Sequence, residues 1–123
     1  MLDHVTIGVR DIERSKRFYD QVLRPLGIDR LYADGPNFAG YGVGKKAFFW
    51  IGQKDVPPTG THVAFTCNDR DSVNAFYTAA IAAGGRDHGQ PGLRPHYHPS
   101  YFGAFILDLD GHNIEAVCHL PVG

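Results

Sequence analysis

The chain opens on the stretch HVTIGVRD at residues 4–11, and the same pattern returns without a gap as HVAFTCND at residues 62–69. Further identities recur in the same order and at the same offset: Phe18-Tyr19 with Phe76-Tyr77, and Gly27 with Gly85. A repeat of this length indicates two copies of one supersecondary unit, neither of which buries its apolar face alone.

Local chemistry predicts the structure of the repeated unit. Residues 5–9 alternate apolar side chains with polar or small ones, which is the period of a half-buried strand. Asp11 is suited to cap the helix that follows, and Gly27 is suited to end that helix in a left-handed conformation. In the second copy Asp69 or Asp71 takes the capping place. Each unit therefore begins with a strand and a helix.

Short β-like runs separated by turn residues follow each helix, at residues 28–33, 38–43, 47–53, 86–90, 101–108 and 113–119. Asp110-Gly111 is a strong hairpin signal between the last two runs. Residues 54–60, which include Pro57-Pro58, are the natural linker between the halves. Each half thus reads β-α-β-β-β, and the predicted fold class is α+β. We expect one domain, residues 1–123, made of two repeats at about 1–55 and 60–120.

Composition limits the possible partners. Apolar residues make up 43% and charged residues 20% of the 123, which is the balance of an ordinary globular domain. With a net charge of -1 the protein has no strong electrostatic field that would attract nucleic acid or a membrane surface, so we expect neither as a partner. The start of the chain lacks a secretory signal, and Cys67 and Cys118 form no C-x-x-C pair. A cytoplasmic location is the expectation.

The residues also carry a family resemblance. Paired βαβββ modules that open on His-Val and close on a strand such as GHNIEAV at residues 111–117 resemble the vicinal-oxygen-chelate superfamily, and so does FILDLDG at residues 105–111. That superfamily includes glyoxalase I, extradiol dioxygenases, fosfomycin-resistance transferases and bleomycin-binding proteins. The resemblance covers nearly the whole chain. It implies that the mixed sheets of the two modules form a cup-shaped half-barrel that holds metal and substrate.

The alternation of side chains along the predicted strands directs three possible metal ligands toward one surface. If residues 5, 7 and 9 face the helix, His4 faces the opposite way, and the same alternation turns His62 inward. On the last strand the alternation leaves Glu115 opposite the apolar face. Two histidines and one carboxylate suit a divalent metal such as Zn, Fe, Mn or Ni, with positions open for water or substrate.

A structural explanation of the same residues remains open. A single histidine on the polar face of a strand is usually a surface or hydrogen-bonded residue, and two at equivalent repeat positions can descend from one duplicated ancestor. Glu115 is harder to explain in this way, because a buried carboxylate needs a cation or hydrogen-bond donors. The hypothesis is metal binding by His4, His62 and Glu115, with Glu115 also a candidate catalytic residue.

The family's fourth ligand position falls on the last strand of the first module. That stretch is AFFWIG at residues 47–52, which offers no ligand, and Gln53 is a poor fit. The resemblance implies that a glyoxalase I has four metal ligands, one of them a catalytic glutamate at this position. This chain lacks that ligand, so authentic glyoxalase I activity is not expected. Trp50 and its two phenylalanine neighbours either form a pocket wall that contacts substrate or pack the core.

Further candidates lie in RPHYHP at residues 94–99, where two prolines hold the chain extended. The functional interpretation makes His98 a general acid or base, with Arg94 and His96 binding the substrate. The alternative is a rigid solvent loop. Thr6 shares the face of His4 and could hydrogen-bond a substrate oxygen, although plain strand packing also explains it.

The leading hypothesis is a metal-dependent enzyme (a lyase, transferase or dioxygenase) that acts on a small oxygen-bearing substrate by stabilising an oxyanion or enediolate. The rival is a metal-free binding module of the bleomycin-resistance kind that sequesters an aromatic or cationic ligand. We also expect a homodimer, since open sheet edges and an apolar cup rim favour association. Pairing across chains would place His4 of one subunit beside His62 and Glu115 of the other; a monomer that closes its own cup is the alternative.

Overall fold

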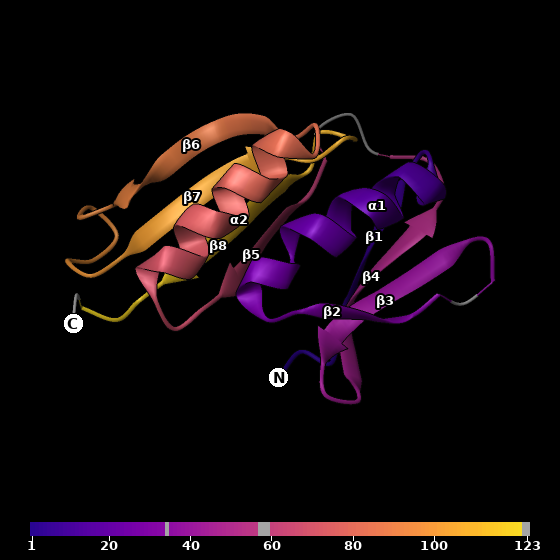
Figure 1. Ribbon diagram of the computed structural model, residues 1–123, viewed down its shortest axis with the longest axis horizontal. Coiled ribbons are helices and arrows are strands. Elements are labelled where there is room, and N and C mark those ends of the chain that lie inside the picture. Colours follow the sequence, from indigo (N-terminus) through magenta and orange to yellow (C-terminus); the bar gives the residue numbers. More distant parts are fainter. Residues whose placement is uncertain (34, 57–59, 122–123) are drawn as a thin grey trace.

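The computed structural model describes residues 1–33, 35–56 and 60–121, so Pro57 and Pro58 of the predicted linker lie outside the described residues. Two successive βαβββ units make up the chain, which confirms the predicted fold class (Figure 1). The first contains β1 (Val5–Val9), α1 (Ile12–Val22), the 3-10 helix η1 (Arg24–Leu26), β2 (Asp29–Tyr32), β3 (Phe38–Val43) and β4 (Lys46–Gln53). The second contains β5 (His62–Thr66), α2 (Arg70–Ala82), β6 (Arg86–Leu93), β7 (Phe102–Leu107) and β8 (Asn113–Cys118).

Each unit forms its own four-stranded mixed sheet. The strand orders are β1-β4-β3-β2 and β5-β8-β7-β6, and in each sheet the first strand pairs in parallel with the last while the other pairs are antiparallel. Both sheets are open. Helices α1 and α2 lie side by side, each over its own sheet (Figure 1). The other face of each sheet is left free of helices and carries the candidate site residues.

The helices begin where the capping signals predict. The carboxylate of Asp11 accepts from the backbone N–H of Arg14 at 3.2 Å, and that of Asp69 accepts from Ser72 at 2.7 Å, so Asp69 rather than Asp71 is the second cap. Helix α1 stops at Val22 because Pro25 has no N–H to continue the ladder. The chain then turns through η1, whose C-cap is Gly27 with φ of 77°. The left-handed conformation of Gly27 is as predicted, but this glycine ends η1, whereas the C-cap of α1 itself is Leu23, four residues earlier.

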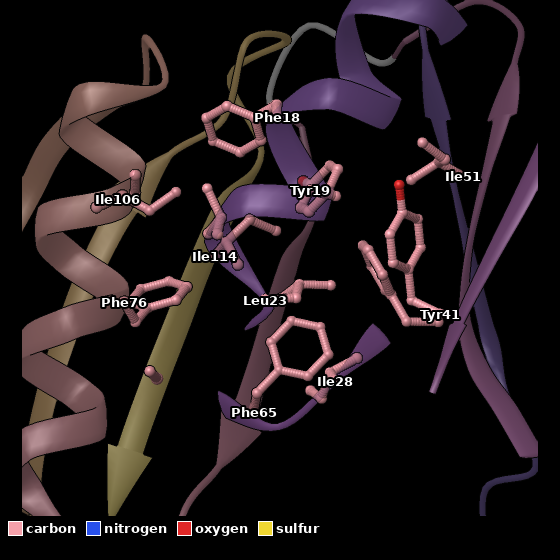
Figure 2. Packing of buried hydrophobic residues seen from close by; sticks show 14 of the residues in the cluster. Phe18, Tyr19, Leu23, Ile28, Tyr41, Ile51, Phe65, Phe76, Ile106 and Ile114 are labelled. Atoms are coloured by element: carbon pink, nitrogen blue, oxygen red, sulfur yellow. The ribbon is translucent and has the colours of Figure 1, made fainter. Parts of the chain in front are cut away.

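One apolar core joins the two modules (Figure 2). Ile7 and Val9 of β1 are buried beneath α1 while Thr6 is exposed, which confirms the predicted alternation. Phe49 of the first module meets Phe65 of the second edge to face, with ring centroids 5.2 Å apart. The apolar faces of both units thus meet in one core.

Buried hydrogen bonds link the modules at one end of the core. The hydroxyl of Tyr19 on α1 donates to Asp108 at 2.5 Å, and Nε2 of His112 lies 2.7 Å from the carbonyl oxygen of Gly8. Burial raises the pKa of the Asp108 carboxyl, and burial followed by the Asp108 charge raises that of the Tyr19 hydroxyl. The loop between β7 and β8 therefore attaches the second module to the first.

No helix in the part of the chain described here has the length and apolar character needed to span a membrane.

Candidate metal and substrate site

Glu115 is the centre of the candidate site. It lies in the middle of β8 and its side chain is only 2% exposed, whereas the side chain of His62 is 53% exposed. Nε2 of His62 lies 2.9 Å from Oε1 of Glu115, although 53 residues separate them in the sequence. The parallel pairing of β5 and β8 brings the two together, with Ala64 opposite Glu115 and His62 opposite Asn113. Two of the three predicted ligands are thus adjacent and share one open face.

Tyr101 provides the second partner of the carboxylate. Its hydroxyl donates to Oε2 of Glu115, and burial, followed by that hydrogen bond, raises the pKa of the Tyr101 hydroxyl. Gly103 makes room for this contact, because an added Cβ there would lie 3.1 Å from the Tyr101 ring. Both oxygens of the buried carboxylate therefore have a partner, as its burial requires.

These side chains line a cavity of about 500 Å³ on the open face of the second sheet. Its remaining walls come from the segment between β6 and β7 and from the end of β8. The full lining is His62, His96, Tyr97, His98, Tyr101, Phe105, Glu115 and His119. Four imidazoles, two phenols and one buried carboxylate thus face one space, which is a polar, aromatic environment suited to an oxygen-bearing ligand.

Two of the predicted loop residues, His96 and His98, line this cavity, and Arg94 does not. Arg94 donates to the carbonyl oxygens of Gln90 at 2.7 Å and Gly92 at 2.8 Å, and its guanidinium lies 5.4 Å from the Phe105 ring centroid. It therefore supports the cavity wall and holds the end of β6. Its positive charge lies next to the site rather than inside it.

A second set of predicted residues lies on the first module. His4 and Trp50 line a separate cavity of about 480 Å³ together with Asp3, Tyr32 and Lys46. The Trp50 ring stacks on Tyr32 with centroids 5.8 Å apart and 9° between the planes. Thr6 pairs in register with Trp50 and is exposed on the same sheet. His4 itself lies 2.7 Å from Asp3 through Nδ1.

The candidate residues therefore divide between the modules. Within residues 1–33, 35–56 and 60–121, no group of three or more His, Cys, Asp or Glu side chains is placed to hold a metal. His62 and Glu115 come together in one cavity, and His4 lies in another. For His4, His62 and Glu115 to bind one metal, the open face of a first module must lie against the open face of a second module.

Sequence reasoning missed Tyr101 as a site residue and assigned no role to His112. Tyr101 precedes β7, and its contact with Glu115 spans 14 residues, so no local periodicity points to it. His119, just after β8, also lines the cavity and lies 2.9 Å from His98. Gln53, the poor candidate for a fourth ligand, instead accepts from the N–H of Ile12 at 3.1 Å and caps α1.

Comparison with known proteins identifies the family. The model of the Glyoxalase/Bleomycin resistance protein/Dioxygenase superfamily matches residues 1–116. The chain belongs to this superfamily. No functionally curated protein matches the sequence. A glyoxalase/bleomycin resistance protein from Albidiferax ferrireducens T118 is 31% identical, with a TM-score of 0.85 over 96% of this chain and 98% of the other.

Superfamily members of lower identity share the fold. The fosfomycin resistance protein FosX from Mesorhizobium loti is 22% identical, with a TM-score of 0.70 over 96% of this chain and 91% of its own. The E126Q mutant of FosX from Listeria monocytogenes, solved with Mn(II) and 1S,2S-dihydroxypropylphosphonic acid, is 18% identical, with a TM-score of 0.71 over 95% and 88%.

The donor set of this superfamily member is chemically suited to a divalent metal. An imidazole nitrogen and a buried carboxylate oxygen 2.9 Å apart are ligand types that Zn, Mn, Fe and Ni accept. The Tyr101 hydroxyl fixes the orientation of the carboxylate from the other side, as outer partners of metal ligands do. His62 and Glu115 are therefore suited to serve as two of the ligands of a metal ion.

Proposed function

We propose that this protein is a metal-dependent enzyme that acts on a small oxygen-bearing substrate, with His4, His62 and Glu115 as metal ligands. The observation that carries the proposal is the buried Glu115 carboxylate, which faces a polar cavity beside His62. His62 and Tyr101 compensate the burial of this carboxylate in the metal-free chain, and a cation held by Glu115 and His62 would compensate it in the loaded protein. The Mn(II) in the FosX structure of the same fold supports a divalent metal here.

The proposal requires a homodimer in which first and second modules of different chains face one another. His4 lies outside the cavity of His62 and Glu115, so a second chain must bring a first-module face against it. The exposed aromatic side chains of that face support such a contact, since Tyr32 is 49% and Phe38 42% exposed. Each dimer would then have two equivalent sites.

The roles of the chain's residues follow from their positions. When bound, a divalent cation would hold substrate oxygens as a Lewis acid and stabilise developing negative charge. His62 and Glu115 would bind it from the second module, with Glu115 held in place by Tyr101. Thr6 and Trp50 would bind substrate from the first module.

The segment between β6 and β7 completes the proposed site. His96 would contact substrate at the cavity rim, and Arg94 would contribute its positive charge through the Phe105 wall. His98 would act on the substrate through His119, because the N–H of Ser100 and Nδ1 of His119 engage both of its ring nitrogens. A cytoplasmic location is part of the same proposal.

Metal content tests the proposal directly. Protein purified without an affinity tag or added metal should contain a divalent metal by elemental analysis, or bind Mn(II) or Zn(II) in the micromolar range or tighter. His62→Ala should remove most of this affinity while leaving the fold intact, because the side chain is half exposed. His88→Ala, at an exposed position outside the cavity, is the matched control. No metal affinity in the wild-type protein would contradict the enzymatic proposal at its first step.

A metal-free binding module is the second candidate, and the aromatic walls favour it. Tyr97, Tyr101 and Phe105 line the same cavity as the buried Glu115 carboxylate, which is an arrangement suited to an aromatic or cationic ligand. Elemental analysis separates the two candidates: a metal-free protein that binds an aromatic cation only when Glu115 is intact would be the module, and a metal-loaded one the enzyme.

Glyoxalase I activity is not expected of either candidate. The last strand of the first module, β4, offers no ligand, and its Gln53 caps α1 instead of entering a site. The methylglyoxal–glutathione adduct should therefore turn over very slowly or not at all. A robust rate that Glu115→Gln abolishes would overturn this interpretation of β4.

A further inference from the structure

A chain of hydrogen bonds fixes the proton positions on two cavity histidines. The backbone N–H of Ser100 donates to Nδ1 of His98 at 3.1 Å. That nitrogen must carry a lone pair, so the neutral His98 ring has its proton on Nε2. Nε2 lies 2.9 Å from Nδ1 of His119, to which it donates. The same logic then requires that the neutral His119 ring carry its proton on Nε2.

The consequence is that both nitrogens of His98 are engaged, whereas Nε2 of His119 has no hydrogen-bond partner among the described residues. His119 follows the end of β8 and lines the same cavity as His62 and Glu115. A neutral imidazole N–H is a hydrogen-bond donor and too weak an acid to give up its proton near neutral pH. His119 therefore offers a donor to the cavity, and His98 determines which nitrogen carries it.

Tyr101 contacts both His98 and His119 and also the Glu115 carboxylate. Its ring packs edge-on against both imidazoles, with centroids 5.5 Å from His98 and 5.3 Å from His119, while its hydroxyl donates to Glu115. The planes of the two imidazole rings are nearly parallel, with 25° between them and centroids 5.1 Å apart. One rigid phenol thus positions the donor and the candidate metal ligand relative to each other.

We propose that the Nε2–H of His119 is a preorganised hydrogen-bond donor for a negatively charged or developing oxyanion of the substrate, and that His98 is a positioning residue. The expected substrate class is one whose carbonyl-type oxygen gains negative charge during reaction, since a fixed neutral donor stabilises such charge without reorganisation. This use of the donor rests on the proposed function. The tautomers themselves are properties of the metal-free chain.

Ring nitrogen NMR tests the proposal without metal or substrate. On ¹⁵N-labelled protein at about pH 8, where ordinary imidazoles are neutral, long-range correlation spectra distinguish the two tautomers. We expect His98 and His119 to be entirely in the Nε2–H form. His112 is an internal standard, because the N–H of Thr61 donates to its Nδ1 at 2.9 Å and its Nε2 donates to Gly8.

Two variants separate positioning from packing. His98→Phe removes the donor to His119, so the His119 ring should become a mixture of tautomers while His112 is unchanged. His98→Gln places an amide N–H close to the position of the lost Nε2–H and should keep His119 in the Nε2–H form. The proposal is overturned if wild-type His119 is mixed or protonated on Nδ1, or if His98→Phe leaves its tautomer unchanged. Failure of metal binding alone would contradict the proposed function and not these tautomers.

Discussion

The imidazole of His112 is completely buried, and its Nε2 donates to the carbonyl oxygen of Gly8, 104 residues away, at 2.7 Å. Its other nitrogen accepts from the N–H of Thr61. One side chain therefore satisfies a backbone group in β1 of the first module and another just before β5 of the second.

We expect His112→Ala to destabilise the protein by about 2–4 kcal/mol, because it leaves a cavity and two unpaired backbone groups. Urea unfolding followed by circular dichroism measures the change. His88→Ala, at an exposed position, should change the unfolding free energy by less than about 0.5 kcal/mol. An equal effect of both variants would show that the buried bond to Gly8 contributes nothing.

Tyr101→Phe removes one of the two partners of the Glu115 carboxylate. We expect a loss of about 1–3 kcal/mol in unfolding free energy, since a buried charged acceptor loses a donor. Tyr97→Phe, at a tyrosine that is 58% exposed, is the matched control. Combining Tyr101→Phe with Glu115→Gln completes a double-mutant cycle, and purely additive effects in that cycle would contradict a direct interaction.

Asp108 gives a defined pH dependence of stability. Burial raises the pKa of its carboxyl in the folded protein above the unfolded value of 3.8, so between those two pKa values the folded state binds more protons than the unfolded state. The stability that this group contributes is therefore largest below pH 3.8 and falls as the pH rises through the folded pKa.

Wild type and Asp108→Asn should thus differ in their pH profiles. The unfolding free energy of wild type relative to the variant should decrease from about pH 3.5 toward pH 7, as the buried carboxyl loses its proton. Urea titrations at several pH values measure both proteins. A difference that stays constant or increases with pH would contradict the raised pKa.

If the metal site forms between two chains, the protein should have the mass of a dimer, and two different variant chains should restore metal binding when they are mixed. Light scattering at micromolar concentration should give twice the chain mass of 13.6 kDa. Chains carrying His4→Ala and chains carrying His62→Ala should each lose metal affinity and, after mixing and exchange, regain one complete site per mixed dimer. Pairing within each chain would restore none, and a mass near 13.6 kDa would exclude the dimer.

Much of the fold and part of the site could be predicted from local patterns. The repeat of residues 4–11 at 62–69 indicated two βαβββ units, and alternation placed Ile7 inside and Thr6 outside, because strand period and helix caps depend on near neighbours. The same alternation put His62 and Glu115 on one face, where pairing of β5 with β8 brings them to 2.9 Å.

Only the tertiary structure decided which faces meet and how the site is supported. The two-residue alternation of side chains along a strand assigns each residue to one face of its own sheet, but it does not say which module lies opposite that face. The separation of His4 from His62 and Glu115 could therefore not be derived from the sequence. The partners of Tyr101 and His98 depend on a turn-rich segment whose path is set by long-range packing. Buried polar contacts of this kind follow from the complete fold and not from sequence spacing.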